Sequence, residues 1–345
     1  MNHRFVIALT GILSLGICGS TRATTYDYAG DPEKGSISPT SQDWKTADGK
    51  MAWVESSPKT TLQIDTLKID PADVKQLTIS VSPEFITAGR LVVGVAGSGW
   101  ANIAYVVLTG SQPLTLEGSG GKPGEFLLES SRNIQRNDAS DTGLITFVPL
   151  LAPNGLLFGG AGQGPEVLKG SLPDGHRMII AAGFKADGAC TKVGPIEVRL
   201  HGVTKLGGPL VVQKGSFDVA AGSEPDKPTL FDIKTMRVEL DARVEFSAPD
   251  GHSVGMTLLL GQSKGDALIT CHGVLKGLQK VALNLLTSDG KPPLPGTYCI
   301  IKRDQLGASA DEFAQVTLNG SALPTYCRMD YGSAGFTVDL VVGKK

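Results

Sequence analysis

Few residues in this chain have the types and the spacing that catalysis requires. The segment Ala96-Gly97-Ser98-Gly99-Trp100 resembles a nucleophile elbow, but both outer glycines of G-x-S-x-G are missing and a second apolar run follows where a helix should begin. The histidines after residue 23 show neither the i, i+4 spacing of a helical zinc site nor an H-x-H pair; they are His176, His201, His252 and His272. The sequence therefore predicts no catalytic residue and no metal ligand.

Two further segments contain residues that ligands use, but each lacks an essential partner. The loop at 137–141 (Asn-Asp-Ala-Ser-Asp) gathers oxygen ligands of the kind calcium takes, without EF-hand spacing or a downstream bidentate glutamate. The glycine-rich loop at 159–164 is not followed by the Lys-Ser/Thr and helix of a phosphate-binding loop. We expect no cofactor.

The carboxylates of the chain leave one enzymatic function as an alternative. The chain has 34 acidic residues, and a glycosidase needs only two that face each other across a cleft. Distant carboxylates brought together by the fold would make a secreted glycan-acting hydrolase, which is the alternative to a non-enzymatic protein.

The N-terminus has the pattern of a secretory signal peptide. Arg4 precedes an apolar stretch at 5–17 that is too short to span a membrane, and Thr21-Arg22-Ala23 offers small residues at the −3 and −1 positions. We expect a signal peptide at 1–23, cleavage after Ala23, and export to the periplasm, the cell surface or the exterior. Lipid attachment at Cys18 is the alternative. No other apolar run is long enough to span a bilayer, so we expect no transmembrane segment in the mature chain.

Cleavage would leave four cysteines, an even number that suggests disulfides in an oxidising compartment. No C-x-x-C motif is present, and four cysteines allow three pairings. Pro-Gly-Thr-Tyr-Cys ending at Cys299 is echoed by Pro-Thr-Tyr-Cys ending at Cys327. We predict a Cys299–Cys327 disulfide, with Cys190 and Cys271 paired across domains or free.

Alternation of apolar and polar residues dominates the elements that would position any site. It is clear at 77–81, 196–200, 236–240 and 336–340, and turn sequences of the type Pro-Asx-Gly separate several apolar runs. Alternation of this kind is typical of antiparallel sheets with one wet face. We predict an all-β fold of two antiparallel β-sandwich-like domains in tandem, with at most one or two short helices.

The polar, proline-containing segment 223–229 is the best candidate for a linker. It divides an N-terminal β domain (24–222), which starts with an irregular segment, from a C-terminal β domain (230–345) that carries the disulfide. A long surface loop inside one domain is the alternative. The glycine-rich segment 118–124 reads as a flexible loop.

Two kinds of binding surface are predicted. Aromatic rings can act as platforms for sugars, and the candidates are Trp100, Tyr26 and Tyr28. The C-terminal run with Phe336, Val338, Leu340 and Val342 is a candidate for strand exchange, in which it completes the sheet of a neighbour.

Together these features favour an exported, non-enzymatic β-sandwich protein that acts as an adhesive, binding or surface-structural component, such as a pilus or appendage subunit. We expect a protein or carbohydrate ligand at the cell exterior, and self-assembly is compatible with the strand-exchange segment. Acidic and basic residues are interspersed and the formal net charge is −2, so nucleic acid is not an expected partner. A periplasmic carrier is a third class.

Overall fold

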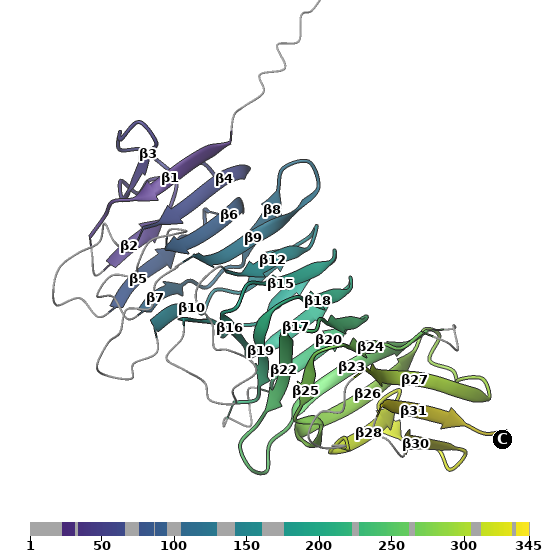
Figure 1. The fold of residues 1–345 in the computed structure, drawn as a ribbon. Coiled ribbons are helices and arrows are strands. Elements are labelled where there is room, and N and C mark those ends of the chain that lie inside the picture. Colours follow the sequence, from purple (N-terminus) through teal and green to yellow (C-terminus); the bar gives the residue numbers. More distant parts are fainter. Residues whose placement is uncertain are drawn as a thin grey trace, which may run out of the picture.

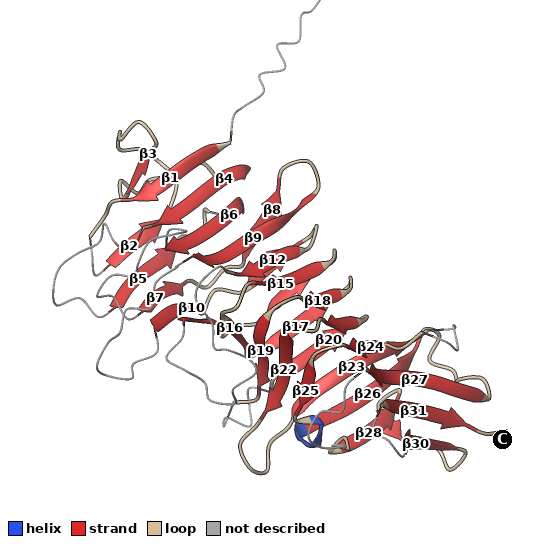
Figure 2. Ribbon diagram, viewed as in Figure 1, coloured by secondary structure: helices blue, strands red, loops and turns tan. Residues whose placement is uncertain are grey.

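The computed structural model describes residues 23–31, 34–65, 76–85, 87–94, 105–129, 142–160, 176–222, 228–261, 266–304, 312–332 and 336–344. Within these ranges nearly every element is a β-strand, and the helical part is one 3₁₀ turn, η1 (Leu278–Lys280). The strands form a mixed network of 22 strands and a separate parallel sheet of nine (Figures 1 and 2).

The prediction of two tandem antiparallel sandwiches was wrong. Most strands pair in parallel with the strand three positions later in the chain, as β9 does with β12 and β12 with β15. The chain therefore coils into a parallel β-solenoid with three strands in each turn, and successive turns stack along its length (Figure 1). We call the three resulting ladders face A, face B and face C.

Face A consists of the parallel-paired strands β1 (Thr24–Tyr28), β4 (Ser57–Ile64), β6 (Thr87–Gly94), β9 (Lys122–Glu129), β12 (Leu156–Gly159), β15 (Cys190–Val193), β18 (Leu210–Val212), β21 (Met236–Val238), β24 (Ile269–Cys271) and β27 (Gly296–Arg303). Face B consists of β8 (Leu114–Gly118), β11 (Leu150–Ala152), β14 (Phe184–Ala186), β17 (Val203–Leu206), β20 (Leu230–Ile233), β23 (Val254–Leu260), β26 (Val281–Thr287) and β28 (Gln315–Leu318). Face C, the nine-stranded sheet, consists of β2 (Lys34–Ile37), β5 (Gln76–Val81), β7 (Tyr105–Thr109), β10 (Thr142–Thr146), β13 (His176–Ile180), β16 (Glu197–Leu200), β19 (Gly215–Ala220), β22 (Ala242–Ser247) and β25 (Val274–Lys276).

Alternation misled the prediction because each face of a solenoid is a parallel sheet with only one side in the core. Strand β22 has buried side chains at Ala242, Val244 and Phe246, and the side chains between them are half-buried. This alternation occurs although β22 pairs in parallel with β19 and β25. The usual link between continuous apolar runs and parallel strands holds only where both sides of the sheet are covered. The sequence pattern of a half-buried parallel strand is thus the same as that of an antiparallel one.

The turns of the solenoid differ in length, so the sequence carries no fixed repeat. Lys192 pairs with Val212, 20 residues later, whereas Leu91 pairs with Phe126, 35 residues later. Sequence repeats are the usual sign of a solenoid. Here the extra residues of the longer turns lie in the connections and hide the period.

The core is a continuous column of inward side chains that stack from one turn to the next. An aromatic series runs through its middle, with ring centroids 6.0 Å apart for Phe158–Phe217, 6.1 Å for Phe217–Phe231 and 6.3 Å for Phe231–Phe246. Each of these rings is at most 2% exposed. Aromatic pairs at such distances add to the energy of area burial.

One charged side chain occupies a place in this core. Lys192 of β15 lies in the inward row of face A between Phe158 and Val212 and is fully buried. Its ammonium donates to the carbonyl oxygens of Gly194 at 2.7 Å, Ile196 at 2.6 Å and Lys214. Lys192 thereby satisfies turn carbonyls that would otherwise be buried without a donor.

Antiparallel strands cover the two ends of the solenoid. At the N-terminal end β3 (Trp44–Thr46) pairs with β1, and at the C-terminal end β31 (Thr337–Val342) lies between β27 and β30 (Cys327–Tyr331), with β29 (Ser321–Ala322) beside β28. Ends of repeat proteins need such coverage to protect unpaired backbone groups.

The predicted linker at 223–229 lies largely outside the described residues. The ladders continue past it, since β17 pairs with β20 and β18 with β21. The division into two domains at this point stays a prediction.

Candidate functional site

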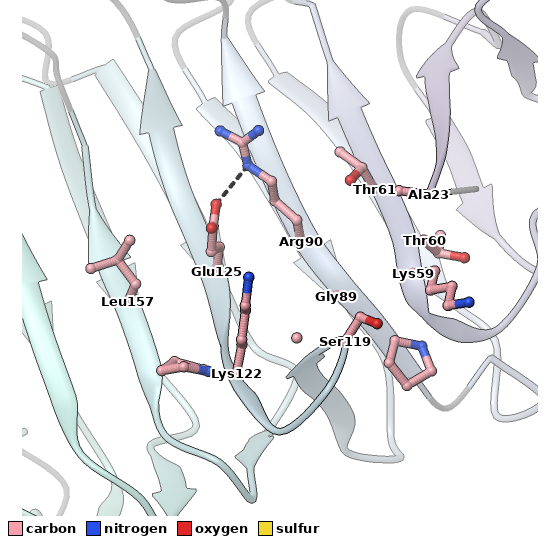
Figure 3. Close-up of a pocket in the computed structure, with 13 residues that line it drawn as sticks. Ala23, Lys59, Thr60, Thr61, Gly89, Arg90, Ser119, Lys122, Glu125 and Leu157 are labelled. Atoms are coloured by element: carbon pink, nitrogen blue, oxygen red, sulfur yellow. Dashed lines mark ion pairs between the residues drawn. The ribbon is translucent and has the colours of Figure 1, made fainter. Parts of the chain in front are cut away.

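The candidate site is a groove of about 570 Å³ on the outer side of face A (Figure 3). Its floor is formed by outward side chains of neighbouring strands: Thr61 of β4 pairs with Arg90 of β6, Arg90 with Glu125 of β9, and Glu125 with Leu157 of β12. Because adjacent strands lie about 4.8 Å apart, the row from Thr61 to Leu157 covers roughly 14 Å. The groove therefore runs across the strands.

The turn of the β8–β9 hairpin forms one wall of the groove. Glu117 pairs with Pro123 and Gly118 with Lys122 in antiparallel register, which turns the chain out of the solenoid. The tip contains Gly120 and Gly121 with φ of 71° and 76°, a conformation that glycine adopts without strain. The glycine-rich segment noted in the sequence is thus the tip of a hairpin that brings Ser119 and Lys122 to the groove.

A bulge in β4 forms the opposite wall. Ser57 pairs with Ala88 and Thr61 with Arg90, so β4 uses four residues where β6 uses two. The three residues between these pairs, 58–60, all line the groove. Gly89 permits this arrangement, because a Cβ atom there would lie 2.1 Å from the carbonyl oxygen of Pro58. Bulges of this type re-aim side chains next to binding sites.

The groove carries three basic side chains and one acidic one. Lys59, Arg90 and Lys122 line it, and Glu125 is bound to Arg90 with Nε and Oε2 2.8 Å apart. Figure 3 shows this ion pair at the centre of the floor, with the two lysines on either side of Gly89. Arg90 pairs with Glu125, and the other two basic side chains of the lining are Lys59 and Lys122.

A second polar cluster lies on the outer side of face C. Arg199 places Nε 2.9 Å from Asp218 Oδ2 and Nη2 3.2 Å from Glu197 Oε1, and Arg177 approaches the same Glu197 oxygen at 3.1 Å. Ser247 donates to Asp218 at 2.8 Å. Burial raises the pKa of Asp218, while Ser247 and Arg199 oppose the shift. Each acid has an arginine partner, so this cluster stabilises the stack of β13, β16 and β19.

Two of the three predicted aromatic platforms, Tyr26 and Tyr28, do not line this groove. Tyr26 and Tyr28 are 5% and 2% exposed and belong to the core, where Tyr28 packs edge-on against Trp44 with centroids 5.3 Å apart. The Tyr28 hydroxyl donates to the carbonyl of Asp31 at 2.6 Å, and burial raises its pKa. Trp100 lies outside the described residues, as do Ser98 and the oxygen-rich loop at 137–141.

The structure does not form the predicted disulfide. Cys190, Cys271, Cys299 and Cys327 are all free thiols. Cys299 lies on β27 and Cys327 on β30, and these strands flank β31 on opposite sides. Two strand spacings of about 4.8 Å exceed the Cα separation of about 4.4–6.8 Å that a disulfide allows. Burial raises the pKa of Cys190, Cys271 and Cys299 to about 11.

The segment predicted for strand exchange is strand β31 of the chain's own sheet. It is hydrogen-bonded to β27 on one side and to β30 on the other. Val338, Leu340 and Val342 are at most 4% exposed, whereas Phe336 is 38% exposed. Both ladder edges of β31 are therefore occupied within the chain.

Among the described residues no group of three His, Cys, Asp or Glu side chains is arranged to hold a metal ion. One histidine–carboxylate pair in the described part of the chain, His272 and Asp304, has Nδ1 and Oδ2 2.6 Å apart and lies on the surface. The described part of the chain also contains no helix long and apolar enough to cross a membrane.

No family model matches this chain, and comparisons with curated proteins and with solved structures found no match. The groove was not foreseen from the sequence. Its only sequence signals are Pro58 in an alternating strand and the glycines around Lys122, which read as ordinary turn signals.

Proposed function

We propose that this is an exported, non-enzymatic binding protein whose solenoid presents the face A groove to an acidic polysaccharide. The observation that carries the proposal is the pair Lys59 and Lys122 on opposite walls of a groove whose one described carboxylate, Glu125, is already bound to Arg90. Export rests on the signal-peptide pattern at 1–23.

The shape of the groove favours a chain over a small anion. Its lining comes from strands β4, β6, β9 and β12 and from a hairpin tip, and it extends across roughly 14 Å of floor. A phosphate or a single sugar acid would contact one lysine and leave the rest of the floor in water. An oligomer with a carboxylate on each sugar can meet both lysines at once.

The chemistry of the groove favours binding over hydrolysis. Glycoside hydrolysis uses two carboxyl groups on either side of the bond, one of them protonated. The described lining of the groove holds one carboxylate, Glu125, which is bound to Arg90 at 2.8 Å, so no second described carboxyl group faces it across the floor. Hydrolysis of the polysaccharide stays the alternative function, and the titration described below also tests for it.

The test is titration of the protein with polygalacturonate, a carboxylated polysaccharide, in parallel with neutral dextran. We expect binding of the acidic polymer that weakens with salt, and about three- to tenfold weaker binding after the double change Lys59→Gln and Lys122→Gln. The matched control is Lys185→Gln with Lys205→Gln, two exposed lysines paired across β14 and β17 on face B, and it should leave affinity within about twofold.

Three results would count against the proposal. They are equal binding of dextran, equal loss in the face B control, and tighter binding of a single-stranded oligonucleotide than of polygalacturonate. Release of new reducing ends during the titration would favour the hydrolase alternative.

A further inference from the structure

The start of strand β1 lies at the edge of the groove. Ala23 is one of the residues that line it (Figure 3), and Thr24 is the first residue of β1. The parallel register sets Thr24 beside Thr60 and Thr25 beside Thr61. Thr60 and Thr61 are themselves groove residues, so the backbone of residue 24 belongs to the same wall as Lys59.

The predicted cleavage site is the peptide bond between Ala23 and Thr24. A signal peptidase hydrolyses this bond with one water molecule. The released signal peptide ends in the carboxylate of Ala23, and the mature chain begins with the amine of Thr24, which takes up a proton. One lining residue is lost, and an α-ammonium appears at the edge of the groove. The amide nitrogen of Thr24 before cleavage carries no charge.

We propose that removal of the signal peptide completes the groove by placing the α-ammonium of Thr24 beside Lys59 as an additional cation. This inference rests on the proposed function, because it concerns the same groove and the same acidic ligand. Export and the acquisition of full affinity would then be one event, and the precursor would bind its ligand more weakly than the mature protein.

The charged groups around Thr24 lie on β4, in the turn after β3, and on β1 and β3 themselves. On β4, Lys59 directly precedes Thr60, the register partner of Thr24. The turn after β3 carries Lys50 and Asp48, which form an ion pair of 3.0 Å with each other. On β1 itself Asp27 lies opposite Lys45 of β3.

Across the groove the charged groups are Arg90, Lys122 and Glu125. An α-amino group ordinarily titrates at about 7.7–8.0, whereas lysine titrates at about 10.4 and arginine higher. Between pH 7 and pH 9 the α-ammonium is therefore the cation at the groove that loses its proton. A bound anion favours the charged form, so its contribution to affinity is present at pH 7 and lost as pH rises past about 8.

The experiment compares three proteins that share residues 24–345. One begins at Thr24, the second begins at Thr24 with an acetylated amine, and the third keeps Gly-Ala before Thr24. The ligand is a defined oligogalacturonate, titrated at pH 7 and pH 9, and thermal unfolding of each protein checks that β1 is equally stable. The mass of the exported full-length chain is measured separately.

We expect the protein that begins at Thr24 to bind about two- to fivefold more tightly at pH 7 than the other two, and the difference to vanish at pH 9. Lys59→Gln in the same protein should weaken binding at both pH values and keep the step between them. The exported chain should have the mass of a protein that begins at Thr24.

Equal affinities of the three proteins at pH 7, or an equal pH step in the acetylated form, would overturn the inference and leave the proposed function standing. Export with cleavage elsewhere would also overturn it. Absence of binding by every form would overturn the proposed function and this inference with it.

Discussion

The ammonium of Lys192 lies 2.7 Å from the position that a Cβ atom on Gly215 would occupy. Gly215 has φ of 75°, and the same Cβ would lie 2.5 Å from the carbonyl oxygen of Pro195. The buried lysine and the glycine of the next turn therefore depend on each other. The Lys192 ammonium occupies the space that Gly215, which has no Cβ atom, leaves open.

We expect Gly215→Ala to lower the free energy of unfolding by about 3 kcal/mol, from backbone strain together with the clash. The matched control is Gly251→Ala, where φ is 80° and no atom lies within 4 Å of the new Cβ, so only strain of about 1 kcal/mol remains. Urea unfolding of both variants measures the difference, and equal losses would show that Lys192 is not constrained by residue 215.

Lys192 also makes stability depend on pH. Burial lowers its pKa to about 7, and Glu197 opposes the shift. The unfolded chain keeps a pKa near 10.4, so between about pH 7 and 10 it holds a proton that the folded protein has released. The contribution of Lys192 to the free energy of unfolding should therefore rise with pH across this window and be level below it.

Urea unfolding at pH 7, 8 and 9 measures this contribution as the difference between the wild-type protein and Lys192→Met, which keeps the volume of the side chain. The difference should grow with pH, while the buried thiols, whose pKa is raised, lower the stability of both proteins as pH approaches 9. A difference that stays level with pH would contradict the prediction. It would mean that the carbonyls of Gly194, Ile196 and Lys214 hold the ammonium strongly enough to offset burial.

The cluster on face C offers a test of buried charge. Arg199 bonds both Glu197 and Asp218, whose side chains are 6% and 8% exposed. Arg199→Met leaves these acids with fewer cationic partners, and we expect a loss of about 2–4 kcal/mol at pH 7. Burial already raises the pKa of Asp218, so the loss should shrink as pH falls and that carboxyl takes up a proton.

Arg237→Met is the control for this change. Arg237 pairs with Glu239 on the surface of face A with its own side chain 58% exposed, and its loss should cost at most about 1 kcal/mol. A similar cost for both variants would indicate that the face C cluster contributes no more than an ordinary surface pair.

Cys299 and Cys327 lie on strands that β31 separates, and all four described cysteines are free thiols in the structure. Alkylation in denaturant without reductant, followed by mass spectrometry, should modify Cys190, Cys271, Cys299 and Cys327. In the folded protein the reaction should be slow, because burial raises the pKa of these thiols and leaves little thiolate at neutral pH. Recovery of a peptide that links Cys299 to Cys327 would contradict the strand order of β27, β31 and β30.

The amino-acid sequence by itself determined that the chain is built from short strands with one buried side. Alternation at 77–81 and 196–200 correctly marks strands β5 and β16, because side chains of any strand point alternately to opposite sides. The sequence marked 118–124 as a flexible loop, whereas the structure places Gly118 in β8 and 122–124 in β9 and leaves only 119–121 between the strands.

Only the tertiary structure decided how these strands pair. Parallel and antiparallel strands have the same sequence pattern when one side of the sheet faces solvent. Solenoid turns of 20 and 35 residues also show no common period. The groove depends on this pairing, since Lys59 and Lys122 lie 63 positions apart in the sequence and face the same floor only because β4, β6 and β9 stack in register. Side-chain chemistry is local and can be read along the chain, whereas the register that brings distant side chains together is a property of the whole coil.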